Sequence, residues 1–174
     1  MHAMEVFPTE MGWVGALVSP QGVVRISLPA PDEGAALTQL LAGWEEEPPQ
    51  ALSTPLLADL RSRLERFYRG EEVALDPPLD LSAHPSFYQR AWAAVREIPW
   101  GATHSYGEVA LRLRTPGAAR AVGTAMAANP VPPVIPCHRV LRSDGSLGGF
   151  GGGLAMKRRM LQNEGSWPRT TSTP

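Results

Sequence analysis

Apolar and β-branched residues gather in two short runs near the start of the chain. Residues 13–19 and 23–28 are rich in valine, leucine and isoleucine, which pack well on a pleated sheet. Between the two runs stands Ser19-Pro20-Gln21-Gly22, a composition typical of a tight turn. The pattern therefore predicts a β-hairpin in this part of the chain.

Farther along the first half, the apolar positions take on helical spacing. Residues 35–43 predict a short helix, and the acidic, proline-rich residues 45–50 indicate a loop. Thr54 can cap a second helix that has Pro55 at its first position. Apolar residues then follow helical spacing up to Gly70. Strands followed by helices predict a small α/β unit.

The second half of the chain predicts a run of short helices, the first over residues 86–97. Ser105-Tyr106-Gly107-Glu108 has the form of a capping box and predicts a helix that runs to about Arg114. Thr115-Pro116 predicts the start of another helix, which ends near Ala128. Two short helices joined by a tight turn suit a DNA-binding helix-turn-helix, and a plain helical hairpin fits the same pattern.

Proline and glycine set the character of the last third of the chain. Residues 131–136 contain three prolines, so we expect a stiff, extended segment that lacks several amide donors. Residues 145–153 contain six glycines and predict a loop that makes close backbone approaches. A final helix is expected over residues 155–164, with Gly165 at its end.

A length of 174 residues suits one ordinary domain or two small ones. The break in pattern near residues 82–85 divides the chain into an N-terminal α/β domain, residues 1–82, and a mostly α-helical C-terminal domain, residues 83–168. Residues 169–174 are expected to form a disordered tail.

The near-neutral net charge hides an asymmetry between the two halves. Residues 1–84 carry 5 basic and 13 acidic side chains, whereas residues 85–174 carry 11 basic and 4 acidic ones. A basic half suggests contact with a polyanion. Two solvated faces of opposite bias explain the same numbers.

The apolar content of 43% is sufficient for a packed core, and no apolar stretch approaches the roughly 20 residues of a membrane span. The start of the chain has no basic segment followed by an apolar run. We therefore expect a cytoplasmic protein that has no secretion signal and does not cross a membrane.

The chain contains one cysteine, Cys137, followed by His138 and Arg139. One cysteine excludes an intramolecular disulfide and argues against a multi-thiolate zinc site, so we expect no metal. A nearby base or positive charge raises the thiolate fraction of a cysteine. Neighbours on an extended chain point in opposite directions, however, so these three residues alone leave a buried core cysteine as the stronger interpretation.

The wider string changes that interpretation. Residues 129–140, Asn-Pro-Val-Pro-Pro-Val-Ile-Pro-Cys-His-Arg-Val, closely resemble the active-site signature of the O6-alkylguanine-DNA alkyltransferases. The resemblance covers about residues 78–165, in blocks that occur in the family's order. Those blocks include Ile98-Pro99, Ser105-Tyr106-Gly107-Glu108, Ala118-Ala119-Arg120-Ala121-Val122-Gly123, Ser143-Asp144-Gly145-Ser146, Gly152-Gly153-Leu154, Lys157 and Glu164-Gly165.

The resemblance implies a ribonuclease H-like fold for the N-terminal unit and a helix-turn-helix in the C-terminal domain. It also implies catalytic roles for five residues. Cys137 is the expected nucleophile, and His138 the base that favours its thiolate, acting through a water. Glu164 is expected to orient His138, Asn129 to hold the turn of the cysteine, and Tyr106 to donate a proton or hydrogen bond to the leaving guanine.

Further residues receive binding roles from the same resemblance. Arg120 is expected to insert into the duplex where the damaged nucleotide is flipped out. The expected substrate-binding residues are Phe150, Gly151, Val140, Pro132 and Lys157. The expected DNA-binding residues are Arg120, Ala121, Thr124, Met126, Ser105 and Thr115.

Several positions depart from the family's common pattern. Phe150 stands where tyrosine is frequent, which keeps a stacking ring and removes a hydroxyl. Gly151 stands where a serine can serve. Ala127 and Ala128 are uncharged where some members carry a basic residue, which affects DNA affinity rather than chemistry. Arg114 and Pro133 also replace commoner residues.

The resemblance implies stoichiometric transfer of an alkyl group from O6-alkylguanine in double-stranded DNA to Cys137, and it leaves open whether O4-alkylthymine is a second substrate. It implies no cofactor, and the protein is expected to be a monomer. Two alternatives stay open. One is a non-catalytic alkyltransferase-like protein that binds the lesion, although Cys137 argues against it. The other is a plain helix-turn-helix regulator.

Overall fold

A computed structural model describes residues 1–168, and the predicted tail at residues 169–174 lies outside the described residues. The contacts divide the chain into two compact units. The first contains residues 1–83 and residues 130–134, and the second contains, of the described chain, residues 84–129 and 135–168. Residues 130–134, which the sequence analysis places in the second domain, are therefore part of the first unit.

The first unit is built on a four-stranded sheet in the order β3-β2-β1-β4. β2 (Gly12–Ser19) pairs with β3 (Gly22–Ile26) as an antiparallel hairpin, as the apolar runs predicted. β1 (Ala3–Thr9) pairs antiparallel with β2, and the two-residue β4 (Gln50–Ala51) runs parallel to β1. β1 was not predicted from the sequence, and Pro8 interrupts its pattern near its end.

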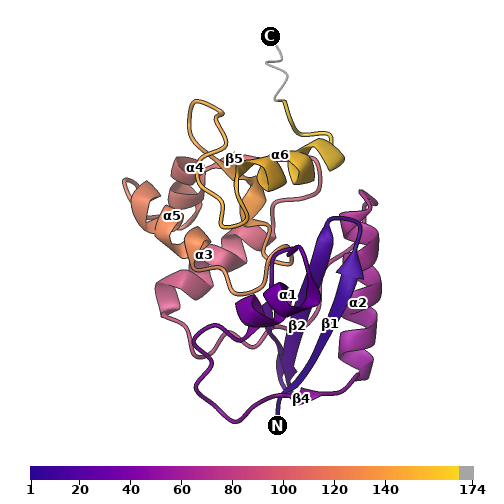
Figure 1. The fold of residues 1–174 in the computed structure, drawn as a ribbon. Coiled ribbons are helices and arrows are strands. Elements are labelled where there is room, and N and C mark those ends of the chain that lie inside the picture. Colours follow the sequence, from indigo (N-terminus) through magenta and orange to yellow (C-terminus); the bar gives the residue numbers. More distant parts are fainter. Residues whose placement is uncertain (169–174) are drawn as a thin grey trace. The chain divides into compact units, whose positions relative to one another are not determined.

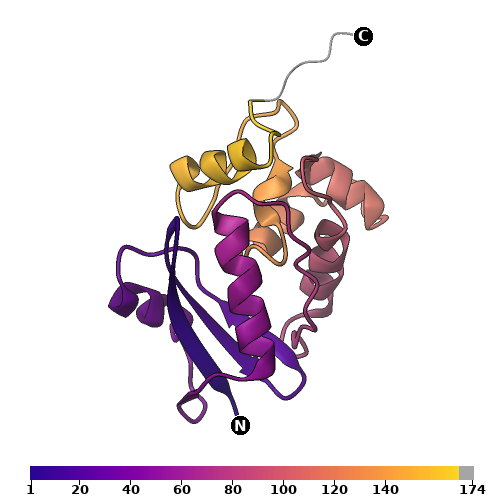
Figure 2. The same ribbon diagram turned by 90° about the vertical axis from the view of Figure 1, so that its right-hand side faces the viewer.

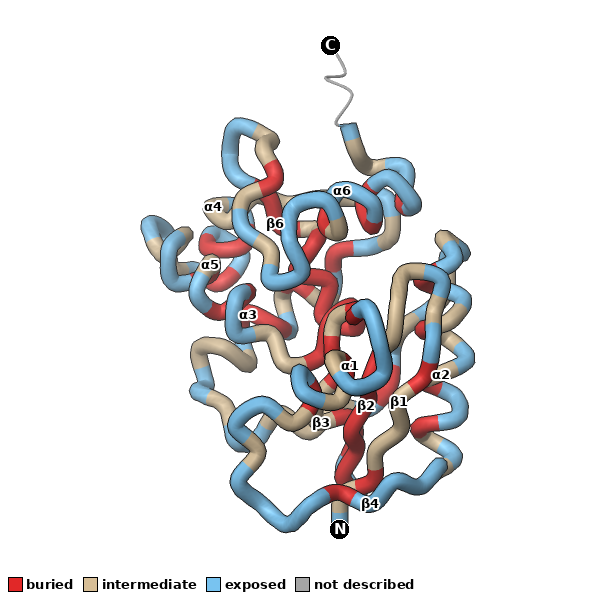
Figure 3. The backbone as a smooth tube through the Cα atoms, in the orientation of Figure 1, coloured by how far each residue is buried: buried red, intermediate tan, exposed pale blue. Residues whose placement is uncertain are grey.

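Two helices cover this sheet. α1 (Glu33–Leu40) packs on β2 and β1, and α2 (Pro55–Tyr68) packs on β1 and β2. Consecutive residues of β2 from Val14 onward are buried, which requires cover on both faces because successive side chains alternate. Figures 1 and 2 show α1 and α2 on different sides of the strands, and Figure 3 shows β2 as a buried segment.

The helix α2 begins as its sequence predicts. The Thr54 hydroxyl accepts a hydrogen bond from the amide of Leu57, and Pro55 is at the first turn. After the Arg69 cap, Gly70 has a φ of 89°, a left-handed conformation that glycine adopts readily. Single residues in the sequence therefore predicted both ends of the helix.

The second unit contains α3 (Ser86–Arg96), α4 (Tyr106–Arg112), α5 (Ala119–Ala127) and α6 (Leu154–Asn163). The first three helices pack against one another, and the Trp92 indole donates to the Ala125 carbonyl at 2.8 Å. A short parallel pair joins β5 (His104–Ser105) to β6 (Val140–Leu141).

The start of α4 follows its capping box. The Ser105 hydroxyl accepts from the Glu108 amide at 3.0 Å, and the Glu108 carboxylate accepts from the Ser105 amide at 2.6 Å. The reciprocal pair satisfies two amides that the first helical turn leaves open.

Two local expectations were wrong. The helix expected from Thr115-Pro116 begins at Ala119, because Gly117 has a φ of 87° that breaks helical geometry. Thr115 does not cap that helix, and its hydroxyl donates to the Ala110 carbonyl at 3.4 Å. Residues 131–136 form bends and a turn rather than an extended segment.

Among the described residues, no helix is long and apolar enough to cross a membrane.

Candidate active site

Cys137 opens a short 3-10 turn, η1 (Cys137–Arg139), that leads into β6. The cysteine is 8% exposed. Its amide donates to the Ile135 carbonyl at 2.8 Å, and the Asn129 side-chain amide donates to the same carbonyl at 2.8 Å. Asn129 follows the end of α5, so its amide fastens the backbone ahead of Cys137 to that helix.

The charge state of Cys137 reflects opposing effects. Burial raises the pKa of the Cys137 thiol, because it removes the water that would solvate a thiolate. A hydrogen bond with Asn129, the positive charge of Lys157 and nearby backbone amides partly offset that rise in pKa. The resting group is therefore a thiol that has preformed partners for its thiolate.

His138 and Glu164 form a buried pair. Nε2 of His138 lies 2.8 Å from Oε1 of Glu164, and the two side chains are 1% and 0% exposed. Glu164 is the C-cap residue of α6, so the last helix supplies the carboxylate to η1. The two residues are 26 positions apart in sequence, and the fold brings them together.

Arg139 completes this cluster, and the sequence analysis gave it no role. Its Nε donates to both Glu164 oxygens at 3.2 and 3.0 Å, and its Nη2 donates to Oε1 at 2.8 Å. Its Nη1 donates to the Ile98 carbonyl at 2.6 Å, just after α3. The guanidinium thus joins η1, α6 and the end of α3. The Cys-His-Arg string contained this residue, but its partners are distant in sequence.

The charge of Glu164 and its contact with Nε2 assign the hydrogen of the neutral His138 ring. Burial alone would raise the pKa of the Glu164 carboxyl, but the bonds from His138 and Arg139 outweigh it and hold the pKa below its usual range. Burial lowers the pKa of His138, and the bond to Glu164 offsets this only in part. An ionised carboxylate only accepts, so Nε2 carries the hydrogen and Nδ1 is left as the basic nitrogen.

Lys157 is a fully buried lysine on α6, with 0% exposure. Its Nζ donates to the Val140 carbonyl at 2.8 Å and to the Gly149 carbonyl at 3.3 Å. Burial lowers the pKa of Lys157 to about 8, and the Cys137 thiolate opposes that shift. Lys157 therefore ties β6 to the glycine-rich loop and brings a positive charge toward the sulfur.

Tyr106 lies between two glycines. A β-carbon built on Gly148 would be 3.1 Å from the Tyr106 hydroxyl oxygen, and one built on Gly123 would be 3.9 Å from the ring. Gly148 has a φ of 70°, so this close approach and its backbone conformation both favour glycine. Burial raises the pKa of Tyr106, and the Cys137 thiolate adds to the rise. The tyrosine therefore keeps its proton at neutral pH.

The predicted DNA-binding residues divide between two environments. Arg120, Ala121 and Thr124 are exposed on one side of α5, together with Ala127. Met126 is 6% exposed on the opposite side of α5, so its predicted DNA contact is corrected: the side chain is buried. The two remaining residues are partly exposed: Ser105 caps the start of α4, and Thr115 lies in the turn between α4 and α5.

The remaining predicted substrate residues belong to both units. Phe150 is partly exposed and Gly151 exposed in the glycine-rich loop, while Val140 is buried in β6. Pro132 lies in the first unit, in residues 130–134. Within the described chain, no group of three or more histidine, cysteine, aspartate and glutamate side chains could hold a metal ion.

The second unit is similar to a known protein family. Residues 86–166 match the family described as 6-O-methylguanine DNA methyltransferase, DNA binding domain. The methylated-DNA–protein-cysteine methyltransferase of Mycobacterium tuberculosis is 46% identical over 104 residues, which is 60% of this chain. The alignment spans 62% of that relative's length.

A longer alignment decides the family. The methylated-DNA–protein-cysteine methyltransferase of Mycolicibacterium paratuberculosis is 43% identical over 122 residues, which is 70% of each chain. This chain belongs to the methylated-DNA–protein-cysteine methyltransferase family.

A solved structure extends the likeness within this family to both units. The crystal structure of Mycobacterium tuberculosis OGT in complex with DNA matches with a TM-score of 0.77 and 30% identity, covering 94% of this chain and 93% of that one. The methyltransferase family fold therefore includes the mixed α/β first unit as well as the helical second one.

Proposed function

We propose that this protein transfers an alkyl group from the O6 atom of a damaged guanine in double-stranded DNA to Cys137, once per molecule. The observation that carries the proposal is the position of Cys137, buried on a turn fastened by Asn129 and followed by the buried His138–Glu164 pair. Its relatives bear the name methylated-DNA–protein-cysteine methyltransferase, and this geometry suits the reaction that the name describes.

The chemical step follows from the proton positions. The Cys137 thiol passes its proton to Nδ1 of His138 through a water, and Glu164 stabilises the imidazolium that forms. The thiolate attacks the alkyl carbon, a carbon–sulfur bond forms, and the carbon–oxygen bond breaks. Guanine leaves with the electron pair and takes a proton or hydrogen bond from Tyr106, whose raised pKa keeps the hydroxyl protonated.

The same chemistry implies a single turnover without a cofactor. The product is a thioether on Cys137, and the chain has no second cysteine that could exchange with it. O4-alkylthymine is the second proposed substrate, and transfer from it follows the same path. The proposed base-binding residues of the second unit are Phe150, Gly151, Val140 and Lys157, and Pro132 of the first unit stays a proposed substrate-binding residue.

We propose that α4 and α5 act as the helix-turn-helix. The exposed side of α5 then faces the duplex with Arg120, Ala121 and Thr124. Extruding a nucleotide costs a few kcal/mol, and Arg120 offsets part of it by filling the gap. Arg120→Ala should therefore slow transfer from duplex DNA and leave transfer from the free alkylated base nearly unchanged; equal losses would contradict the wedge role.

The sheet order and the helix cover of the first unit support a ribonuclease H-like fold. We propose a monomer that works in the cytoplasm, at the nucleoid when it is bound to DNA. The alternative function is binding of the lesion without transfer, and it requires no nucleophile at position 137.

Incubation with an oligonucleotide that carries a radiolabelled O6-methyl group tests the proposal. The parent protein should acquire about one label per molecule, and Cys137→Ala and Cys137→Ser should acquire none while still binding the lesion. Binding without label in the parent supports the lesion-binding alternative. Binding that ignores the lesion supports a regulator, and label on Cys137→Ala would overturn the nucleophile.

A further inference from the structure

The turn between α4 and α5 contains an unusual backbone position. After the Leu113 cap of α4, the Arg114 amide donates to the Leu111 carbonyl at 2.9 Å, and the Thr115 amide donates to the Ala110 carbonyl at 3.0 Å. This pairing closes the helix in a Schellman-type turn, whose residue after the cap takes a left-handed conformation. That residue is Arg114, with a φ of 57°.

Glycine is the usual residue at such a position. α2 ends on Gly70 with a φ of 89°, and α6 ends on Gly165 with a φ of 71°. Among the described residues, Arg114 is the one residue other than glycine with a positive φ. A β-carbon crowds the following carbonyl in this conformation, so arginine is strained where glycine would not be.

No ion pair within the described residues explains why an arginine stands at position 114. Arg114 is exposed, and it forms no ion pair within residues 1–168. The sequence from residue 109 to residue 143 contains no acidic residue. By contrast, the four arginines of α2 and its cap, Arg61, Arg63, Arg66 and Arg69, all pair with carboxylates.

Two further exposed arginines belong to the same stretch of chain. Arg112 lies in the last turn of α4, and Arg120 lies in the first turn of α5. The α4–α5 turn is thus flanked by positive charge on both helices, without an internal counter-ion from residues 109–143. Such a segment suits an anionic partner that has regularly spaced charges.

We propose that Arg114 binds a backbone phosphate of DNA, from a turn whose backbone glycine would fit with less strain. This inference rests on the proposed helix-turn-helix function and names a contact that positions the protein without reading sequence. It predicts two opposite effects of Arg114→Gly. Loss of the side chain weakens DNA binding, whereas glycine relieves the strain of the left-handed backbone and stabilises the fold.

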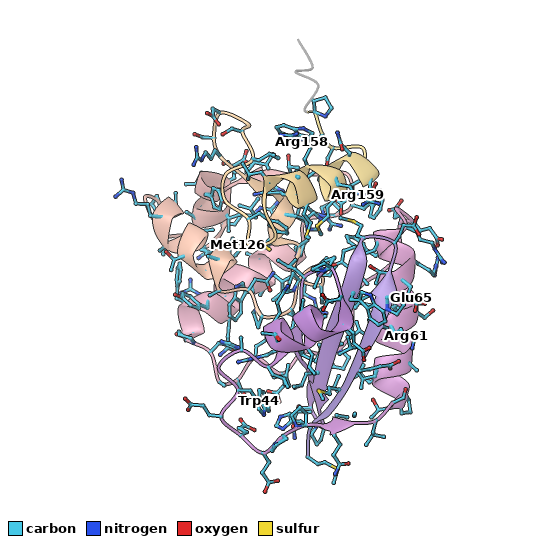
Figure 4. The ribbon with its side chains drawn as sticks, in the orientation of Figure 1. Trp44, Arg61, Glu65, Met126, Arg158 and Arg159 are labelled. Atoms are coloured by element: carbon cyan, nitrogen blue, oxygen red, sulfur yellow. The ribbon has the colours of Figure 1, made fainter. Side chains whose placement is uncertain are left out.

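Three variants separate charge from strain. Arg114→Ala removes the guanidinium and keeps the β-carbon, Arg114→Gly removes both, and Arg158→Ala removes an exposed arginine of α6 (Figure 4). Binding to a short undamaged DNA duplex is measured by fluorescence anisotropy over a range of salt concentrations. Thermal unfolding of each variant gives its Tm.

Both Arg114 variants should bind about fivefold more weakly at 0.1 M salt, with the slope of log affinity against log salt reduced by about one. Arg114→Gly should unfold about 2–4 °C above Arg114→Ala. Arg158→Ala should keep the parent's slope. An unchanged slope in both Arg114 variants, an equal loss in Arg158→Ala, or no gain in Tm for glycine over alanine overturns the proposal.

Label transfer from the free alkylated base separates this inference from the proposed function. It does not require the duplex, so both Arg114 variants should transfer at the parent's rate. If the parent protein transfers label and the Arg114 variants bind DNA as the parent does, only the proposed phosphate contact is overturned. A parent that transfers no label sinks the proposed function, while the salt slopes still decide the role of Arg114.

Discussion

Arg61 in the first unit and Arg139 in the second both bond to glutamate, and the two arginines differ in their surroundings. In the first unit, Arg61 on α2 donates to Glu65 and to Glu5 of β1, and 42% of its side chain is exposed (Figure 4). In the second unit, Arg139 donates to both oxygens of Glu164; Arg139 is 11% exposed and the carboxylate 0%.

The comparison shows that burial, rather than the pair itself, decides what an ion pair does. Water screens the Arg61 network, so it contributes about 0–1 kcal/mol to stability. The Arg139 pair lies where an unpaired charge is costly, and the bonds from His138 and Arg139 hold the pKa of the Glu164 carboxyl below its ordinary value. Only the second network also includes a histidine next to a cysteine, which couples its charges to the proposed chemistry.

Removal of the buried carboxylate should have the largest effect. Glu164→Gln keeps the shape of the side chain and leaves Arg139 as an uncompensated buried charge, so unfolding should cost about 3–5 kcal/mol less than in the parent. Alkyl transfer should fall about 100-fold or more, because His138 loses the group that stabilises its imidazolium. Urea denaturation and label transfer measure the two effects.

The matched control is Glu65→Gln in the first unit, where the carboxylate is 35% exposed. It should change the unfolding free energy by less than about 1 kcal/mol. Equal losses in the two variants would remove the distinction between the networks.

Substitution of Arg139 should have an intermediate effect with a characteristic pH signature. The charge of Arg139 lowers the pKa of His138, so Arg139→Gln should raise that pKa and move the acid limb of the transfer rate to higher pH. Arg139→Lys keeps the charge and should leave the limb nearly in place, with about 1–3 kcal/mol lost from stability in either variant. Transfer rates measured with the free alkylated base from pH 5 to 8 test this prediction. An unchanged acid limb in Arg139→Gln would show that the charge of Arg139 does not set the pKa of His138.

Acid should destabilise the protein in two stages. Burial lowers the pKa of His138 below its ordinary value of 6.5, so the unfolded chain binds that proton first as the pH falls. Stability is therefore complete above about pH 6.5 and decreases below it, by at most about 1.4 kcal/mol per pH unit for one proton. Glu164, whose pKa is held below its ordinary value of 4.5, adds a second loss at lower pH.

Urea denaturation of the parent and of His138→Gln between pH 7.5 and 5 checks the first stage. The variant lacks the imidazole, so its stability should change less over this interval. Parallel pH profiles for the two proteins would show that other groups cause the loss.

The smallest effect is expected at Arg61. Arg61→Ala removes its bonds to Glu5 and Glu65 and its position over the Phe7 ring, yet exposure limits the loss to about 1 kcal/mol. Transfer to Cys137 should keep the parent's rate. A loss comparable with that of Glu164→Gln would show that the first network is not screened as its exposure implies.

Local signals in the sequence predicted the elements whose ends depend on neighbouring residues. The β2–β3 hairpin, the Thr54 cap of α2 and the Ser105–Glu108 capping box all rest on contacts within a few residues. The predicted start of α5 was wrong. Thr115-Pro116 has the form of a helix cap, but the left-handed conformation of Gly117 prevents the helix from beginning there.

Contacts between distant residues explain what the sequence could not predict about the site. Cys137, His138 and Glu164 came from a family resemblance, and no spacing rule joins residues 26 positions apart. Arg139 was overlooked because its value depends on Glu164 and on the Ile98 carbonyl, 41 positions away. Met126 was assigned to DNA by its place on α5, although the side chain is buried on the other side of that helix.

The five residues 130–134 have a consequence for how this protein can be rearranged by recombination. They lie between α5 and Cys137 in sequence but belong to the first unit, where the Ile26 amide donates to the Pro130 carbonyl at 2.9 Å. Val131 and Val134 are 0% and 2% exposed. A crossover after residue 83 would exchange most of one unit and leave these residues facing foreign partners. A viable exchange must therefore replace two separate stretches of the gene together, and the inner one ends three residues before the nucleophile.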